Sequence, residues 1–163
     1  MNRSELSAER ARELFNYDPA TGSLTWKVNK GRARAGSRAG TPNEEGYLRV
    51  EAEGSKYHVH RLAWLITTGS WPKGLIDHRN GVRSDNRWGN IREATRSTNA
   101  ENQRQAKANS ITGFLGVYPE RGRFRAQIKA LGTVRHLGYY RTPEEAHQAY
   151  LTAKRQLHSG CMI

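Results

Sequence analysis

Four side chains within residues 76–102 have the types and the spacing of a hydrolytic site. Asp77 and His78 are adjacent, Asn90 follows the histidine by 12 residues, and Asn99 follows it by 21. A histidine can accept a proton from water near neutral pH, and a carboxylate can hold a hard divalent cation through oxygen. Such a cation stabilises negative charge on a phosphate and on its leaving oxygen. The pattern predicts metal-assisted hydrolysis of a phosphodiester.

The backbone predicted around these residues is a strand, a loop and a returning strand. Residues 79–90 are rich in Asn, Gly and Asp, which is typical of a structured loop. The loop joins a strand over 76–78 to a short strand over 90–92. Asn90 can hydrogen-bond across the loop and fix it. Adjacent strand residues point to opposite faces, but the Asp–His pair can still converge on one site at a strand end.

A helix is predicted to follow over residues 94–105. In this helix Asn99, Asn102 and Gln103 share one face, at intervals of three and four residues. Asn99 can offer a side-chain oxygen to the ion that Asp77 binds. The predicted unit therefore binds a metal ion between its first strand and its helix.

The net charge indicates a polyanionic partner. The 163 residues include 27 Lys and Arg against 15 Asp and Glu, a formal charge of +12. Nucleic acid is the first candidate and an anionic membrane the second. The membrane is the weaker candidate because no apolar run approaches the roughly 18–20 residues of a spanning helix. The charged N-terminal sequence lacks the apolar core of a signal peptide, so we expect a cytoplasmic protein.

The hydrophobic core is expected to be small and to lack disulfides and structural zinc. Cys161 is the only cysteine, which excludes disulfides within the chain and a cysteine-based structural zinc site. Hydrophobic residues make up 36% of the sequence, so small sub-domains are expected.

Upstream of the hydrolytic stretch, the pattern predicts short elements joined by turns. In chain order they are a helix over 4–15, a turn at 18–22, a strand over 24–26, a hairpin over 46–59 and a buried helix over 61–69 that Gly69 ends. Residues 27–43 are basic and contain no acidic side chain. They form either a solvated loop or a loop that lies against phosphates.

A second α+β unit is predicted near the C-terminus. Its elements are strands over 114–118, 123–130 and 133–139 and a helix over 141–158. Thr142 can cap this helix, with Glu145 at the capping-box position. The sequence 104–113 reads as a polar linker. Residues 1–103 contain 17 basic and 12 acidic side chains, and residues 104–163 contain 10 and 3, so both parts should face the same anion.

The middle strand of this second unit has one apolar and one basic face. Phe124, Ala126 and Ile128 alternate with Arg123, Arg125, Gln127 and Lys129. The apolar set would pack on the helix. Arginine can read guanine and glutamine can read adenine, while the remaining basic side chains hold phosphates. The alternative is an ordinary solvated strand face.

Residues 57–102 strongly resemble the HNH endonucleases, in particular the phage-type homing endonucleases. The resemblance is carried by "HRLAW", "GLIDHRNG", "DNRWGNIREAT" and the Asn-rich helix that follows. The upstream "LFNYDPATGSLTWK" and "GYLRV" are also typical of phage members. The resemblance implies a ββα-metal core with one divalent cation, Mg²⁺ or Mn²⁺. The cysteine-held zinc of many members is not possible here.

The resemblance also implies a role for each residue of the pattern. His78 is the general base that activates water, and Asp77 is a metal ligand. Asn90 orders the loop and orients the base. Asn99 is the second metal ligand, and Asn102 replaces it if the register differs by one helical turn.

Residues 113–155 resemble the DNA-binding domain of plant ethylene-response factors, which recurs in phage homing endonucleases. The pieces that carry the resemblance are "GFLGVY", "GRFRAQI" and "HLGYYRTPEEAHQAY". It implies a three-stranded antiparallel sheet that enters the major groove and is packed on one helix. The side chains that would approach DNA are Tyr118, Arg121, Arg123, Arg125, Gln127, Lys129 and His136.

Three features depart from the plant pattern. The loop between Val117 and Gly122 is shorter, His136 stands where plant members often have Trp, and Arg135 occupies a position that is usually apolar.

These observations predict an α+β protein with two functional parts. The domains expected are a nuclease domain over 1–103 with its core at 57–103, a linker over 104–112 and a DNA-binding domain over 113–160. The expected activity is site-specific cleavage of double-stranded DNA, with no membrane and no evident protein partner. A monomer is expected to nick, whereas a dimer would cut both strands. The alternatives are a DNA-binding regulator with an inactive core and an RNA-binding accessory protein.

Overall fold

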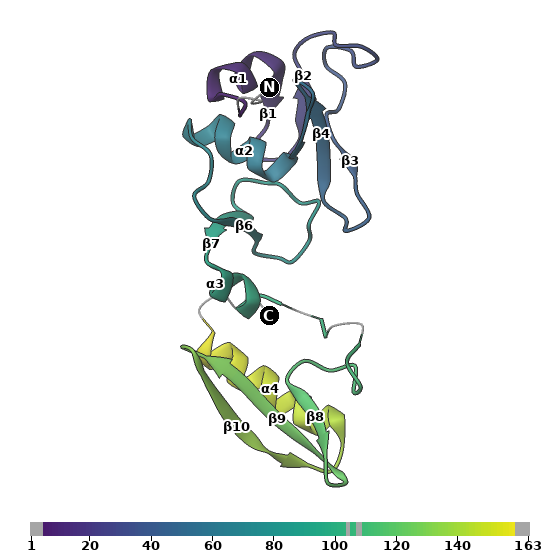
Figure 1. The fold of residues 1–163 in the computed structure, drawn as a ribbon, viewed down its shortest axis with the longest axis vertical. Helices are drawn as coiled ribbons and strands as arrows, with labels where there is room; N and C mark the ends of the chain where they lie inside the picture. The colour runs from purple at the N-terminus through teal and green to yellow at the C-terminus, as the bar shows by residue number, and fades with distance from the viewer. Residues whose placement is uncertain (1–4, 104, 107–108, 159–163) are drawn as a thin grey trace. The chain divides into compact units, whose positions relative to one another are not determined.

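The computed structural model describes residues 5–103, 105–106 and 109–158. It divides the chain into two compact units, Met1–Thr95 and Arg96–Ile163, and each is considered by itself. Both combine helices with antiparallel strands, which confirms the predicted α+β class (Figure 1). Among the described residues, none of the helices has the length and apolar character needed to cross a membrane.

The first unit is built from short elements. In chain order they are α1 (Ala8–Leu14), β1 (Phe15–Tyr17), β2 (Leu24–Trp26), β3 (Thr41–Pro42), β4 (Leu48–Ala52), β5 (Ser55–His58), α2 (Val59–Thr68), β6 (Leu75–His78) and β7 (Ile91–Ala94). Strands β1 and β2 form one antiparallel pair, β3, β4 and β5 form a three-stranded sheet, and β6 pairs with β7.

Helix α1 is shorter than the helix predicted over 4–15. Ser7 caps its start, and the Ser7 side chain accepts a hydrogen bond from the Arg10 N–H at 3.1 Å. The predicted end at Phe15 is wrong, because Phe15 has extended backbone angles and begins β1. Its ring lies 4.6 Å from that of Trp26 on the paired strand, and this buried contact favours the strand.

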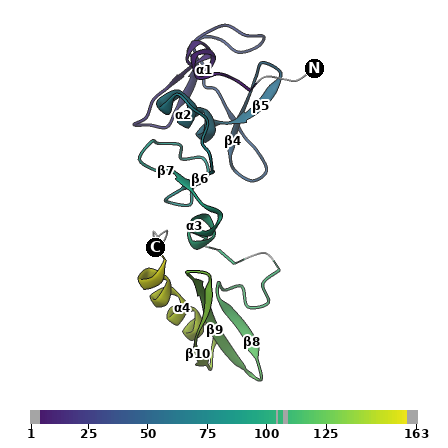
Figure 2. The same cartoon turned by 60° about the vertical axis from the view of Figure 1, so that its left-hand side comes forward.

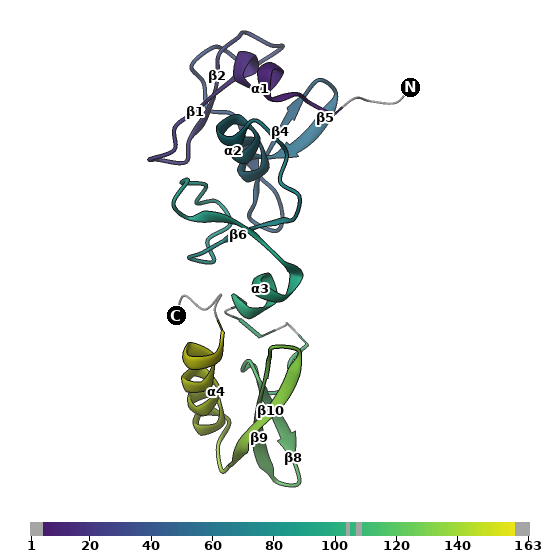
Figure 3. The same cartoon turned by 90° about the vertical axis from the view of Figure 1, so that its left-hand side faces the viewer.

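Helix α2 is the centre of the first unit's core. It contacts α1, β4 and β5, and the two turned views show these elements around it (Figures 2 and 3). Val59, Leu62 and Ala63 are fully buried. As predicted, Gly69 ends the helix in a left-handed conformation, and its N–H donates to the Leu65 carbonyl.

The second unit contains a three-stranded sheet and its covering helix. Its elements are α3 (Arg96–Glu101), β8 (Val117–Glu120), β9 (Arg123–Ala130), β10 (Thr133–Tyr140) and α4 (Pro143–Leu157). The strand order is β10-β9-β8, and α4 packs on one face of the sheet (Figure 1). Thr142 and Glu145 form the predicted capping box at the start of α4.

Two boundaries of the second unit differ from the predictions. Strand β8 begins at Val117 because Gly113 and Gly116 adopt positive φ angles, which keep the preceding residues in a turn. Helix α3 ends at Glu101, so Asn102 and Gln103 lie outside it. The Gln103 N–H bonds to the carbonyl three residues back, which tightens and ends the helix.

The turn between β1 and β2 provides a stability test. A Cβ at Gly22, whose φ is +74°, would lie 2.4 Å from the Arg87 nitrogen and 2.5 Å from the Asn86 carbonyl carbon. We expect Gly22→Ala to lower the free energy of unfolding by about 3 kcal/mol or more, through left-handed strain and overpacking together. Urea unfolding followed by tryptophan fluorescence reports on the first unit, because all 4 tryptophans lie in it.

Gly46→Ala is the matched control. Gly46 also has a positive φ, +85°, but nothing lies within 4 Å of an added Cβ. The control should cost only the backbone strain, about 1 kcal/mol. Equal losses in the two variants would contradict the tight packing of the turn on the Asn86–Arg87 peptide.

Candidate active site

The β6–β7 pair carries the predicted Asp–His motif at its end. Its register sets Asp77 opposite Arg92 and His78 opposite Ile91. Residues directly opposite each other share a face of the pair, and neighbours along a strand alternate faces. Asp77 and His78 therefore leave β6 on opposite faces, and both are buried. Their predicted convergence on one site stays a prediction.

Arg92 holds the carboxylate of Asp77. The Arg92 Nε and Nη2 atoms donate to the same oxygen, Asp77 Oδ2, at 3.0 and 2.9 Å. The Asp77 side chain is 6% exposed. A buried carboxylate needs such a charged, hydrogen-bonding partner to offset the cost of its burial.

His78 is held by a residue that the sequence did not point to. Its Nε2 lies 3.0 Å from the Oδ1 atom of Asn86, and both side chains are buried. Burial lowers the pKa of His78 below its ordinary value, although the Asn86 hydrogen bond and the carboxylates of Asp77 and Asp85 oppose this. The imidazole is therefore neutral near pH 7, the form that accepts a proton.

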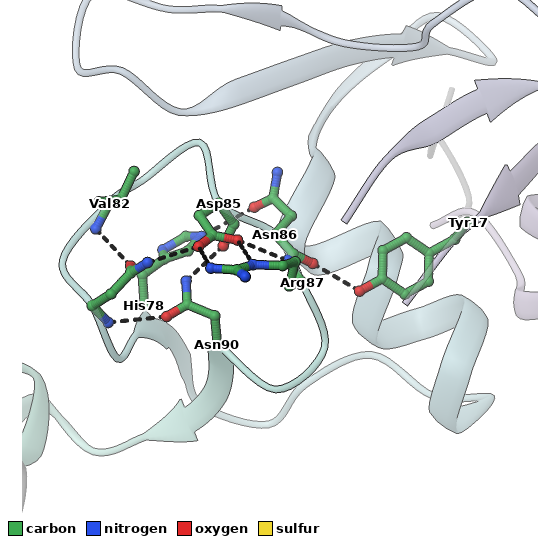
Figure 4. Close-up of polar contacts among 8 residues, drawn as sticks. Tyr17, His78, Val82, Asp85, Asn86, Arg87 and Asn90 are labelled. Carbon is green, nitrogen blue, oxygen red and sulfur yellow. Dashed lines mark hydrogen bonds and ion pairs between the residues drawn. The ribbon is translucent and has the colours of Figure 1, made fainter. Parts of the chain in front are cut away.

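Asn90 closes the loop between the two strands, as its position predicted (Figure 4). Its Oδ1 accepts from the Asn80 N–H at 2.9 Å, and its Nδ2 donates to the Asp85 carbonyl at 2.7 Å. The Arg79 N–H also donates to the Asn90 carbonyl at 2.8 Å, which extends the strand pairing into the loop. The catalytic importance of this order stays a prediction.

Asp85 organises the middle of the same loop (Figure 4). Its carboxylate accepts from Arg87 Nε at 2.8 Å and Nη2 at 2.6 Å, and from Asn80 Nδ2 at 2.7 Å. These bonds, those of the Arg87 side chain most of all, lower the pKa of Asp85 to about 2.

Three rings from another part of the first unit, those of Tyr47, His58 and His60, form a cluster with His78. The His60 ring meets His78 edge-on, at 5.1 Å and 86°, while Tyr47 lies 5.9 Å from His78 and stacks on His58. His60 is buried in the first turn of α2, where burial above all lowers its pKa to about 3. A permanently neutral ring beside His78 packs without adding charge.

The outer face of the second unit's sheet gathers most of the predicted DNA contacts. Ala126 and Ile128 of β9 are buried against α4, so the side chains that alternate with them point to the outer face of the sheet. The residues paired with these outward-pointing positions share that face. The predicted residues on this face are Tyr118, Arg123, Arg125, Gln127, Lys129 and His136. Arg121 lies instead at the tip of the β8–β9 turn, with φ +50°.

The register also adds a residue that the sequence analysis missed. Tyr139 lies opposite Arg125, as does Tyr118 on the other neighbouring strand, so two half-exposed tyrosines flank one arginine. A bulge between His136 and Gly138 shifts the alternation of β10, and strict alternation therefore misplaces Tyr139. Glu120 partly neutralises the positive charge of Arg125, because its carboxylate lies 3.2 Å from the guanidinium. The same carboxylate accepts a hydrogen bond from the Tyr139 hydroxyl.

The remaining predicted ligand belongs to the other unit. Asn99 lies in α3, and its predicted place beside Asp77 stays a prediction. Among the described residues, no group of three or more His, Cys, Asp or Glu side chains is arranged to hold a metal ion. A cation here would need amide, water or phosphate oxygens besides a carboxylate.

Asp85 makes the unfolding free energy of the first unit depend on pH. Its folded pKa of about 2 is below the ordinary 3.8, so the ionised carboxylate stabilises the fold above about pH 4. This contribution, about 1–2 kcal/mol, is lost as the pH falls toward 2. We expect Asp85→Asn to flatten the fall in unfolding free energy between pH 5 and pH 3, measured by tryptophan fluorescence in urea. Glu51→Gln, an exposed carboxylate of β4, is the control, and an unchanged slope in Asp85→Asn would contradict the account.

Comparison with known proteins agrees with this geometry. The family model of the HNH endonucleases matches residues 57–101, which span α2, the β6–β7 pair with its loop, and α3. Neither the curated proteins nor the solved structures gave a match. Residues 57–101 are an HNH endonuclease domain, from a family of metal-dependent phosphodiesterases.

Proposed function

We propose that the chain is a site-specific DNA endonuclease of the homing type, which hydrolyses phosphodiester bonds in duplex DNA. The observation that carries the proposal is the buried, neutral His78 held through Nε2 next to a buried carboxylate, within the stretch that matches the HNH family. In this proposal His78 takes a proton from water, and Asn90 keeps the loop that positions it. The resulting hydroxide attacks phosphorus and the bond to the 3′ oxygen breaks.

The donor set suits one hard divalent cation, for which we propose Mg²⁺ or Mn²⁺. Asp77 supplies a carboxylate kept in place by Arg92. We propose Asn99 as the second ligand, with Asn102 as its replacement if the helix is shifted by a turn. Mg²⁺ commonly binds one or two carboxylates and completes its shell with water and phosphate oxygens. When bound, the cation would stabilise charge on the phosphate and on the leaving oxygen.

We propose that the second unit reads DNA as the ethylene-response-factor domain does, through the outer face of its sheet. The charge of residues 104–163, the shared face of Arg123, Gln127 and Lys129, and the helix behind them support this. Exposed arginines of the 27–43 segment, Arg32 among them, would add phosphate contacts. A monomer has one such site and is expected to nick.

The principal alternative is a DNA-binding regulator whose HNH core does not cut. The hydrogen bonding of His78, Asn90 and Asp77 supports the enzyme, because the proposed hydrolysis requires a histidine and a carboxylate that are fixed in position. One observation supports an RNA-binding role: Tyr118 and Tyr139 share the outer face, and aromatic side chains on a sheet can stack on the bases of single-stranded RNA. Competition between duplex DNA and single-stranded RNA for the full chain distinguishes these partners.

Cleavage of supercoiled DNA tests the proposed function. Plasmids that carry a sequence selected by binding from a randomised insert library should be converted to open circles in Mg²⁺ and left intact in EDTA. His78→Ala should lower the rate by about 10²–10⁴-fold, the usual contribution of a general base. Tight binding of a selected sequence with no cleavage by the wild type would instead favour the regulator.

A pair of matched variants tests the reading face. Lys129→Ala removes an exposed outer-face cation, so binding should weaken and the slope of log K against log salt should fall by about 1. Arg135→Ala removes an exposed cation opposite the buried Ile128, on the helix side of the sheet, and should change the slope much less. Equal effects of the two variants would refute the assignment of the outer face.

A further inference from the structure

Asn86 is buried although it belongs to the polar loop. It is 1% exposed and lies outside the strands and helices. Its side-chain oxygen, Oδ1, approaches Nε2 of His78 at 3.0 Å (Figure 4). Burying an amide is costly unless its hydrogen bonds are made. Nδ2 of Asn86 is buried without a hydrogen-bond partner among the described residues, so the bond of Oδ1 to His78 is the one that fixes the side chain.

The identity of the two atoms determines which ring nitrogen carries hydrogen. An amide oxygen only accepts, so Nε2 must donate. A neutral imidazole has one N–H, and the lone pair that accepts a proton is then on Nδ1. A proton taken from water would bind Nδ1, while the Nε2–H bond to Asn86 would be kept in the imidazolium.

The neighbouring rings leave His78 little freedom to rotate. His60 meets it edge-on at 5.1 Å, and Tyr47 lies at 5.9 Å on a tilted plane. A ring flip that exchanged Nδ1 with Nε2 would have to move against these buried rings. The polar contact with Asn86 can therefore select one of two orientations.

Asn86 is itself held by the N-terminal hairpin. The Tyr17 hydroxyl donates to the Asn86 carbonyl at 2.7 Å, in a buried contact across 69 residues of sequence. The Trp88 N–H donates to the Pro19 carbonyl at 3.0 Å. Gly22 brings the β1–β2 turn against the Asn86–Arg87 peptide, where a Cβ would clash at 2.4 Å. Three contacts thus fix the backbone that carries the amide.

We propose that Asn86 is a positioning residue, which holds His78 as the Nε2–H tautomer with Nδ1 as the proton acceptor, and that the β1–β2 hairpin keeps Asn86 in place. The inference rests on the proposed role of His78 as general base. In this proposal residues 15–26 support the positioning of His78, although they lie outside the 57–101 stretch that matches the HNH family.

The tautomer can be measured without DNA, metal or activity. In the full chain labelled with ¹⁵N-histidine, long-range ¹H–¹⁵N spectra at pH 8 distinguish the protonated from the lone-pair nitrogen of each neutral ring. The chain has 6 histidines, and the signals that disappear in His78→Gln assign the one required. The expected result is hydrogen on Nε2 of His78. Hydrogen on Nδ1, or rapid exchange between both forms, would overturn the proposal.

Two substitutions of similar size then separate positioning from packing. Asn86→Leu keeps the volume but removes the acceptor, so we expect mixed tautomers and a kcat for cleavage lower by about 10–100-fold, with KM little changed. Asn86→Asp restores an acceptor oxygen and should return the Nε2–H form and most of the kcat. Wild-type tautomer and kcat in Asn86→Leu would overturn the proposal. Asn16→Leu, at an exposed position of β1, controls for the added leucine.

Tyr17→Phe tests the support from the hairpin. It removes only the hydroxyl bond to the Asn86 carbonyl, and the expected result is a kcat several-fold lower with KM unchanged and exchange broadening of the His78 signals. Sharp, wild-type signals and an unchanged kcat would remove the hairpin from the proposal. Absence of cleavage by the wild type would refute the proposed nuclease, whereas the tautomer of His78 would still decide the role of Asn86.

Discussion

The hydrogen bonds of one buried amide, Asn90, hold the candidate site together. They tie the start of the 79–90 loop to its middle while the Asn90 backbone pairs with Arg79. Because the loop returns at that point, β6 and β7 pair with Asp77 opposite Arg92. Loss of the amide would leave the Asn80 N–H and the Asp85 carbonyl, both in part-buried bonds, without their partner. Each such hydrogen bond typically contributes about 0.5–1.5 kcal/mol. The positions of Asp77 and His78, the proposed metal ligand and the proposed base, follow from this closure of the loop.

Burial then determines the protonation state of the site. Desolvation lowers the pKa of His78, while the Asn86 hydrogen bond and two carboxylates act in the opposite direction. Because desolvation dominates, the ring is a neutral base under ordinary conditions, and the neighbouring charges prevent a larger fall. The carboxylate of Asp77 is kept on the other face of the strand by a bidentate arginine. The proposed base and the proposed metal ligand can therefore be adjacent in sequence without forming a simple ion pair.

The sequence was informative where local rules dominate. The alternation of β9, the glycine that ends α2 and the capping box of α4 depend on neighbouring residues alone, and all were predicted. The ends of α1 and α3 were not, because a ring contact with Trp26 and a tightened last turn override helix propensity. Asn86 and Arg92 could not be identified, since nothing local distinguishes Asn86 from the other loop asparagines. Their roles depend on the loop's path and on contacts from the distant Tyr17 and from the paired strand.

Chemical rescue of a histidine deletion tests the central claim most directly. His78→Ala leaves a buried cavity the size of an imidazole, because the native ring is 4% exposed. If His78 is the general base, cleavage of a selected DNA site in Mg²⁺ should be lost in the variant and return in proportion to added imidazole. Cleavage by His78→Ala at the wild-type rate without imidazole would contradict the account.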